Sequence, residues 1–179
     1  MAERWQDLVE AHLAALGVIP TLALSGWRMH LLLVPTFHRS CWLSFNDTEQ
    51  ALELELVVLQ EEPIRSSRRD RLKLGKSCCW EDLVQVPEAQ TSALRSLIAT
   101  IDMARMENVE LAARDGIFLQ CWYSDPAIRH SFVMTSPTPA LTPRHHRLVQ
   151  AALDAAIASI ALPEVHLYLQ HVSRYLVSR

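Results

Sequence analysis

The amino-acid sequence predicts an α+β fold: an antiparallel sheet of about five strands, a three-stranded meander plus a hairpin, covered by about four helices. Three observations lead to this prediction. Apolar residues alternate with polar ones in short segments, they recur at helical spacing in longer segments, and the alternating segments follow one another closely. Strands that are adjacent in sequence, with helices before and after them, are typical of an antiparallel sheet beneath a helical layer.

Length and composition agree with a globular protein. The chain has 179 residues, of which 50% are hydrophobic and 21% are charged, and it contains only 4 Gly against 9 Pro. This apolar content is too high for a disordered chain, and the length predicts a single domain over residues 1–179. Within that domain, the C-terminal helix 163–178 either joins the core or is an appended helix that serves oligomerisation.

A helix opens the chain and three strands follow it. Residues 3–16 carry apolar side chains at helical spacing, and Gly17 is typical of a helix end. Residues 22–34, 40–46 and 51–59 alternate apolar and polar side chains, as strands with one buried face do. Their closeness in sequence favours an antiparallel meander.

The polar-side positions of these strands supply the first candidate contacts. Glu53 and Glu55 alternate with leucines, so both carboxylates are expected on a solvated strand face. Trp42, and Trp122 in a later strand, lie on the faces opposite to the predicted core residues. Either helices cover both faces of the sheet, or an aromatic patch is left for a partner.

The second half of the chain is predicted to contain a hairpin between helices. Proline near the start of each helix and turn residues between the strands set the boundaries. The expected elements are a helix over 87–105, strands over 117–123 and 128–134, and helices over 142–161 and 163–178.

Charge is distributed unevenly, although the net charge is only −3. Residues 1–64 carry 3 basic and 9 acidic side chains, whereas residues 65–76 carry 6 basic side chains and 1 acidic one. The basic segment is either an ordinary exposed loop or a contact for an acidic protein or a phosphate group. It has no aromatic residue to stack a base, so nucleic acid is not expected as a partner. Its candidate contact residues are Arg65, Arg68, Arg69 and Arg71.

Common catalytic signatures are missing from the sequence. It contains no GxSxG, GxxxxGK[ST], GxGxxG or HExxH pattern. His166 and His171 are five residues apart, which places them on different sides of a helix. Cys78 and Cys79 follow the basic segment, the kind of surroundings that activate a thiol. We predict no catalytic residue, no metal and no cofactor, and keep a metal- or thiol-dependent enzyme with dispersed His and Cys residues as the alternative.

Targeting features are also missing. The N-terminus carries acidic residues where a secretory signal would be basic, and no apolar run approaches the length of a membrane span. We therefore expect a cytoplasmic protein with reduced cysteines and no membrane partner.

The stretch Trp27–His38, which two further predicted strands follow, resembles the opening of a group of small bacterial α+β proteins. The matching features downstream are Asp115-Gly116, His130 in the hairpin, and Ser136-Pro137. The resemblance covers about residues 25–160. Members are encoded near bacterial toxins and defence systems, so it implies immunity-type binding; it implies no catalytic residues.

These observations predict a non-enzymatic protein-binding module, an immunity or accessory protein of a bacterial toxin–antitoxin or defence system that engages one protein partner. A structural subunit of a larger assembly and a homo-oligomer are the further alternatives. The candidate partner-binding residues are Trp42, Glu53, Glu55, Arg65, Arg68, Arg69, Arg71 and Trp122.

Overall fold

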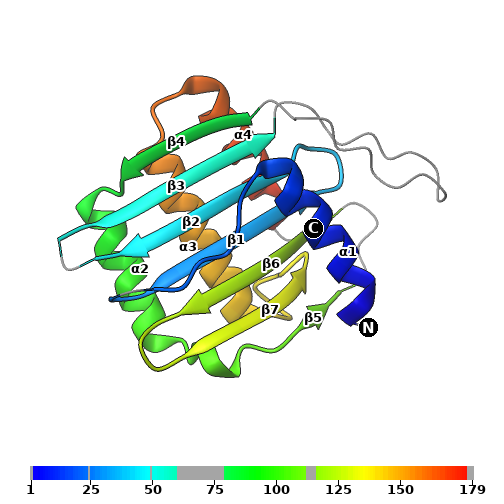
Figure 1. Cartoon of the computed structure of the whole chain (residues 1–179), viewed down its shortest axis with the longest axis horizontal. Helices are drawn as coiled ribbons and strands as arrows, with labels where there is room; N and C mark the ends of the chain where they lie inside the picture. The colour runs from blue at the N-terminus through cyan, green and yellow to red at the C-terminus, as the bar shows by residue number, and fades with distance from the viewer. Residues whose placement is uncertain (1, 24, 49, 60–78, 112–115, 177–179) are drawn as a thin grey trace.

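The computed structural model describes residues 2–23, 25–48, 50–59, 79–111 and 116–176 of the chain. Within these residues it shows an α+β fold with four α-helices and one seven-stranded sheet (Figure 1). The α+β class predicted from the sequence is confirmed. None of the described helices is both long enough and apolar enough to cross a membrane.

Seven strands, four α-helices and two short 3-10 helices make up the described fold. The strands are β1 (Arg28–Pro35), β2 (Cys41–Asp47), β3 (Leu52–Leu59), β4 (Cys79–Gln85), β5 (Val109–Glu110), β6 (Ile117–Ser124) and β7 (Arg129–Thr135). The helices are α1 (Ala2–Leu16), α2 (Glu88–Thr100), α3 (Pro143–Ser159) and α4 (Pro163–Ser173), with the 3-10 helices η1 (Met103–Arg105) and η2 (Arg174–Leu176).

The sheet is mixed, with the strand order β4-β3-β2-β1-β6-β7-β5. Neighbouring strands pair antiparallel, except that β5 runs parallel to β7. The prediction of about five antiparallel strands is therefore wrong in strand number and in the orientation of one strand. The predicted meander is β1–β2–β3 and the predicted hairpin is β6–β7, and β4 and β5 extend the sheet at its two edges.

Both strands that the sequence did not predict lie at an edge of the sheet. In β4, Glu81 and Asp82 are adjacent, and most of its side chains are exposed. A strand with so little buried surface does not need alternating apolar residues, and charges on an edge oppose unwanted pairing. β5 has only two residues, which is too short for any periodic pattern.

Two predicted boundaries also change. The strand predicted over 22–34 begins at Arg28, because the residues before it cross a face of the sheet instead of pairing with it. Ala23 N–H, for example, donates to Ser124 Oγ at 2.8 Å. The helix predicted over 87–105 ends at Thr100, and the 3-10 helix η1 follows. The predicted connection 60–77 lies outside the described residues.

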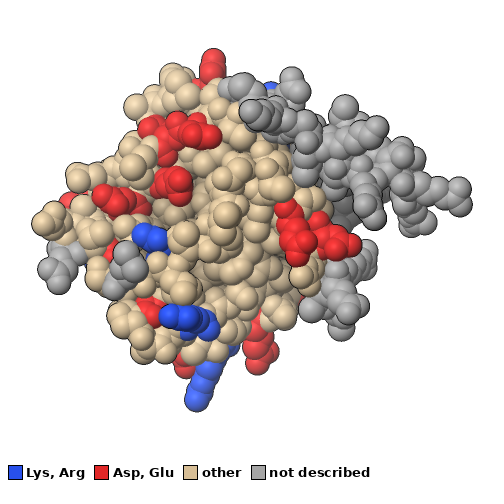
Figure 2. Space-filling model, viewed as in Figure 1, with Lys and Arg blue, Asp and Glu red and all other residues tan. Residues whose placement is uncertain are grey.

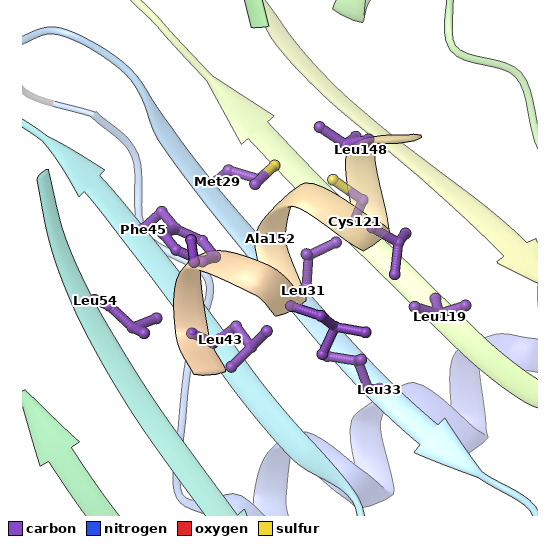
Figure 3. Close-up of a cluster of buried hydrophobic side chains, with 14 of the residues drawn as sticks. Met29, Leu31, Leu33, Leu43, Phe45, Leu54, Leu119, Cys121, Leu148 and Ala152 are labelled. Atoms are coloured by element: carbon purple, nitrogen blue, oxygen red, sulfur yellow. The ribbon is translucent and has the colours of Figure 1, made fainter. Parts of the chain in front are cut away.

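Helices cover both faces of the sheet. The larger buried cluster joins one sheet face to α2, α3 and α4, and Leu148 and Ala152 of α3 lie over its centre (Figure 3). The smaller cluster joins Leu32 and Trp42 on the opposite face to Val9 of α1. The predicted alternation in the first three strands is thus correct. Since β1 contributes to both clusters, its continuous apolar run is explained by burial on two faces.

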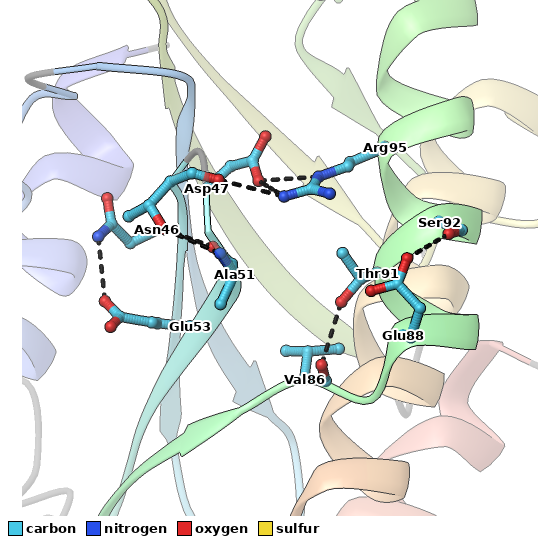
Figure 4. A network of polar contacts seen from close by, with 10 residues as sticks. Asn46, Asp47, Ala51, Glu53, Val86, Glu88, Thr91, Ser92 and Arg95 are labelled. Atoms are coloured by element: carbon cyan, nitrogen blue, oxygen red, sulfur yellow. Dashed lines mark hydrogen bonds and ion pairs between the residues drawn. The ribbon is translucent and has the colours of Figure 1, made fainter.

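A polar corner ties α2 to the turn between β2 and β3 (Figure 4). Arg95 Nε and Nη2 donate to Asp47 Oδ1 at 2.9 and 2.7 Å. Thr91 Oγ donates to the carbonyl oxygen of Val86 at 3.1 Å, which fixes the start of α2 against the end of β4. In this corner the charged groups position the helix, and the apolar side of α2 provides the burial.

The C-terminal helix α4 contributes to the larger cluster. Val165, Leu169 and Val172 are buried there, and Tyr168 O–H donates to the carbonyl oxygen of Arg39 at 2.6 Å. These contacts lie on the apolar side predicted from the helical spacing. On the other side of α4, Leu167 is 52% exposed.

Candidate functional site

A trough runs along β6 and β7 on the sheet face that carries α1. It consists of two pockets, with volumes of about 810 and 290 Å³, which share Trp122 and Ser131 in their linings. Cross-strand pairing brings its floor together, because Trp122 lies opposite Ser131 and Gln120 lies opposite Val133. We call this feature the β6–β7 trough and define it by these four floor residues.

The walls of the trough come from segments that are far apart in the chain. Trp5, Gln6 and Val9 of α1 line the larger pocket, and residues 20–22, which follow α1, line the smaller one. Asn108 lies at the outer side, where its Oδ1 accepts a hydrogen bond from Val133 N–H at 2.8 Å. α1 lies in front of the sheet in the orientation of Figure 1.

The first turn of α1 is held firmly at one end of the trough. The indole N–H of Trp5 donates to Glu110 Oε1 at 3.0 Å, and its ring stacks on Phe118 with 4.7 Å between centroids. One contact reaches β5 and the other reaches β6. The aromatic wall is thus formed in the free protein, so a ligand would not have to order it.

The central floor residue, Trp122, is the outer member of an aromatic cluster. Its ring centroid lies 5.6 Å from that of Trp42, which in turn stacks on His30 at 4.7 Å. Trp42 is only 1% exposed, because α1 packs over it, whereas Trp122 is half-buried. The predicted contact of Trp42 with a partner therefore does not fit this structure; Trp42 packs beside Trp122 on the same sheet face.

His30 is buried at 3% exposure and lies beside the segment that walls the smaller pocket. Its Nε2 lies 3.1 Å from the backbone nitrogen of Thr21 and 2.9 Å from the carbonyl oxygen of the same residue. Burial lowers the pKa of His30 to about 4, and the positive charge of Arg28 acts in the same direction. His30 is thus neutral at physiological pH and holds the 20–22 segment in place.

Two polar atoms beside the trough have no hydrogen-bond partner within the described part of the chain. They are His30 Nδ1 and the indole Nε1 of Trp42. Burying an unpaired donor costs about 1–3 kcal/mol, so this stack is a costly feature of the core.

The predicted acidic contacts lie on the same sheet face but away from the trough. Cross-strand pairing places Glu55, Ser44, His30 and Trp122 in one row, so Glu55 is separated from Trp122 by three strand spacings, about 14 Å. Glu55 is exposed. Glu53 is half-buried and accepts a hydrogen bond from Asn46 Nδ2 at 3.2 Å (Figure 4). The structure does not bring either carboxylate to the trough.

The predicted basic contacts cannot be placed in the same way. These residues, Arg65, Arg68, Arg69 and Arg71, lie outside the described residues. The view of the α1 face in Figure 2 shows a largely uncharged centre with acidic groups and a few basic groups around it. That uncharged centre is what aromatic anchors at the middle of a binding surface require.

The sequence did not identify most of the trough. Trp5 and Val9 were predicted only as core residues of a helix, and Ser131 and Val133 gave no signal beyond the alternation of a strand. That alternation does place both on the same face as Trp122 once the hairpin register is known. The wall contributed by α1 has no local signal, because it depends on where the helix docks.

Possible reactive groups elsewhere are dispersed. Cys41 and Cys121 are buried, and burial raises the pKa of the Cys41 thiol to about 12 and that of Cys121 still further. Cys78 lies outside the described residues, and Cys79 is half-buried with its Sγ 3.9 Å from the carbonyl oxygen of Ala15. Among the described residues, no three His, Cys, Asp or Glu side chains group together as a metal site would require.

Alkylation should separate these thiols. We expect iodoacetamide to leave Cys41 and Cys121 unmodified in the folded protein and to label both after unfolding in guanidinium chloride, because a buried thiol at high pKa gives little thiolate. Mass spectrometry of the digested peptides measures each site, with the half-buried Cys79 as an internal comparison. Equal labelling of Cys41 before and after unfolding would contradict the burial seen here.

Comparison of the chain with protein-family models, with curated proteins and with solved structures found no significant match. The resemblance to small bacterial α+β proteins therefore stays a prediction.

Proposed function

We propose that this protein is a binding module that receives an extended segment of a partner protein in the β6–β7 trough. The observation that carries the proposal is the half-buried Trp122 on the floor of a preformed trough whose wall is a second tryptophan, Trp5. Tryptophans at the centre of a surface are frequent anchors of protein–protein binding.

The lining chemistry suits a peptide. Val9 and Val133 add apolar surface beside the two tryptophans, and the amides of Gln6, Asn108 and Gln120 can donate to and accept from a peptide backbone. A mainly apolar pocket with a few polar groups is the usual composition of a ligand site.

The dimensions favour an extended segment. β7 has seven residues, so the trough beside it is about 20 Å long, which matches about six residues of extended chain. Charge differs between its ends. Glu110 pairs with the last residue of β7, Thr135, and the exposed Arg129 begins the strand. We expect a basic side chain of the bound segment near Glu110 and an acidic one near Arg129.

An immunity or accessory role in a bacterial toxin–antitoxin or defence system is the finer form of this proposal. It rests on the resemblance in the sequence pattern, and the trough supports only the coarser statement that a protein segment binds. The partner implied by either form is one protein.

Filling the trough should weaken binding. Ser131 is exposed and lies at the junction of the two pockets, so Ser131→Arg places a long side chain in the trough without removing core contacts. Peptides of about twelve residues are selected from a displayed random library on the wild-type protein, and their affinities are then measured by fluorescence anisotropy. We expect Ser131→Arg to weaken them at least about tenfold.

The matched control is Ser96→Arg, which adds the same side chain at an exposed position on α2, a helix that covers the other face of the sheet. Wild-type affinity is expected for this variant, with unchanged thermal melting for both. The proposal fails if no peptide is selected, or if the selected peptides bind Ser131→Arg as tightly as they bind Ser96→Arg.

A further inference from the structure

The outer edge of the sheet at β4 carries backbone hydrogen-bonding groups that no other strand of the described residues pairs with. β4 is the last strand of the sheet on this side, and among the described residues no other strand pairs with its outer edge. Leu83 at its centre is 69% exposed, and Glu81 and Gln85 beside it are exposed as well. Neither a proline nor a bulge interrupts β4 between Cys79 and Gln85.

The direction of these groups follows from the pairing with β3. Val86 N–H donates to the carbonyl oxygen of Leu52 at 2.9 Å, which fixes the side to which this residue points. In an antiparallel ladder alternate residues point to opposite sides. The N–H and C=O groups of Glu81, Leu83 and Gln85 therefore point away from β3, along the open edge.

We propose that a second copy of this chain pairs with β4 antiparallel about a twofold axis at Leu83. In this register Leu83 faces Leu83 of the other copy, and each Glu81 faces a Gln85. All three outward-pointing residues then form hydrogen-bonded pairs, which gives about six backbone hydrogen bonds between the copies. The sheets of the two copies become one continuous sheet.

Like charges exclude one neighbouring register, and a proline excludes the other. Moving the axis to Asp82 would place the two Asp82 carboxylates directly opposite each other, which is unfavourable. Moving it to Val84 would place Pro87, which has no N–H, opposite Glu81. With the axis at Leu83, Asp82 faces Val84 and no like charges lie directly opposite. The edge is thus self-complementary in one register.

The second copy is favoured over other occupants by this symmetry. A strand from an unrelated protein would have to match the acidic pair Glu81 and Asp82, which oppose pairing in most registers. In a copy of the same strand, Gln85 lies opposite Glu81 and Val84 lies opposite Asp82. The turn 160–162 between α3 and α4 lies at the same margin of the molecule (Figure 1) and includes Leu162, which is 43% exposed.

Sedimentation equilibrium of the full chain tests the pairing. We expect the wild type to form a dimer of the 20.3 kDa chain in a concentration-dependent manner. Leu83→Pro removes the central outward N–H while leaving the pairs with β3, and it should give a monomer with wild-type far-UV circular dichroism. A monomeric wild type at all concentrations overturns the proposal.

Charge changes at Gln85 test the register itself, whether or not Leu83→Pro folds. Gln85→Glu places two like-charged pairs with Glu81 and should raise the dissociation constant about fivefold, whereas Gln85→Lys should lower it by a similar factor. Ser96→Glu on α2 is the control for added charge. A dimer whose dissociation constant responds equally to Gln85→Glu and Gln85→Lys would place the interface elsewhere and overturn the proposal.

Discussion

Acidification from about pH 7 to about pH 4 should lower the free energy of unfolding by about 3 kcal/mol through His30 alone. In the folded protein the pKa of His30 is lowered from 6.5 to about 4, mainly by burial. Below pH 6.5 the unfolded chain binds a proton at this imidazole and the folded protein does not. Protonation therefore stabilises the unfolded state relative to the folded one. The stabilisation is complete above pH 6.5 and is lost as the pH falls toward 4.

The measurement is urea denaturation at several pH values, on the wild type and on His30→Phe. Phenylalanine keeps a ring against Trp42 but cannot take a proton. The free energy of unfolding of the wild type, measured relative to that of the variant, should therefore fall by about 3 kcal/mol on acidification. Burial also lowers the pKa of His145, so the free energy of unfolding of the wild type falls by more than the contribution of His30. The difference between the two proteins removes that common contribution.

His166→Phe on the outer side of α4 is the matched control, since the same ring exchange there is far from the aromatic stack. We expect its stability to follow that of the wild type at each pH. A difference between wild type and His30→Phe that stays constant from pH 7 to pH 4 would contradict the neutral, buried state of His30.

Replacement of Gly26 by alanine should destabilise the protein by more than about 2 kcal/mol. Gly26 has φ of +62°, and a Cβ there would meet the backbone carbonyl oxygen of Asp47. That oxygen cannot swing aside, because Asp47 N–H donates to the carbonyl oxygen of Trp27 at 2.8 Å and fixes the local backbone. The variant has to move β1 or β2 at the point where they begin to pair.

Gly17→Ala provides the comparison. Gly17 also has a positive φ, of +70°, but a Cβ there would have nothing within 4 Å. Its cost should be the backbone strain alone, about 1 kcal/mol. Urea denaturation of both variants measures the two effects, and equal losses would show that contact with Asp47 contributes nothing.

Much of the fold follows from local sequence patterns. Alternation predicted which side chains of β1, β2 and β3 share a face, and helical spacing predicted the buried sides of all four helices. Gly17 and the proline-led helix starts set boundaries that the structure keeps within a few residues. These features depend on the periodicity of the backbone, which a sequence carries directly.

In the candidate site, local sequence patterns do not predict which side chains are covered. Trp42 and Trp122 have the same signature, an aromatic residue opposite the predicted core, yet one is 1% exposed and the other lies open on the floor of the trough. The difference is made by α1, which packs over Trp42, whereas Trp122 lies at the margin of the same cluster and stays half-buried. A pattern of alternation states which face a side chain occupies, but not what covers that face.

The sequence by itself thus determined the α+β class, most elements and the orientation of their side chains. Only the tertiary structure decided the two edge strands, the trough and the open edge at β4. Periodic patterns arise from burial within an element, and β4 buries too little to have one. The trough arises from contacts between Trp5 and residues more than a hundred positions away, which no local pattern records.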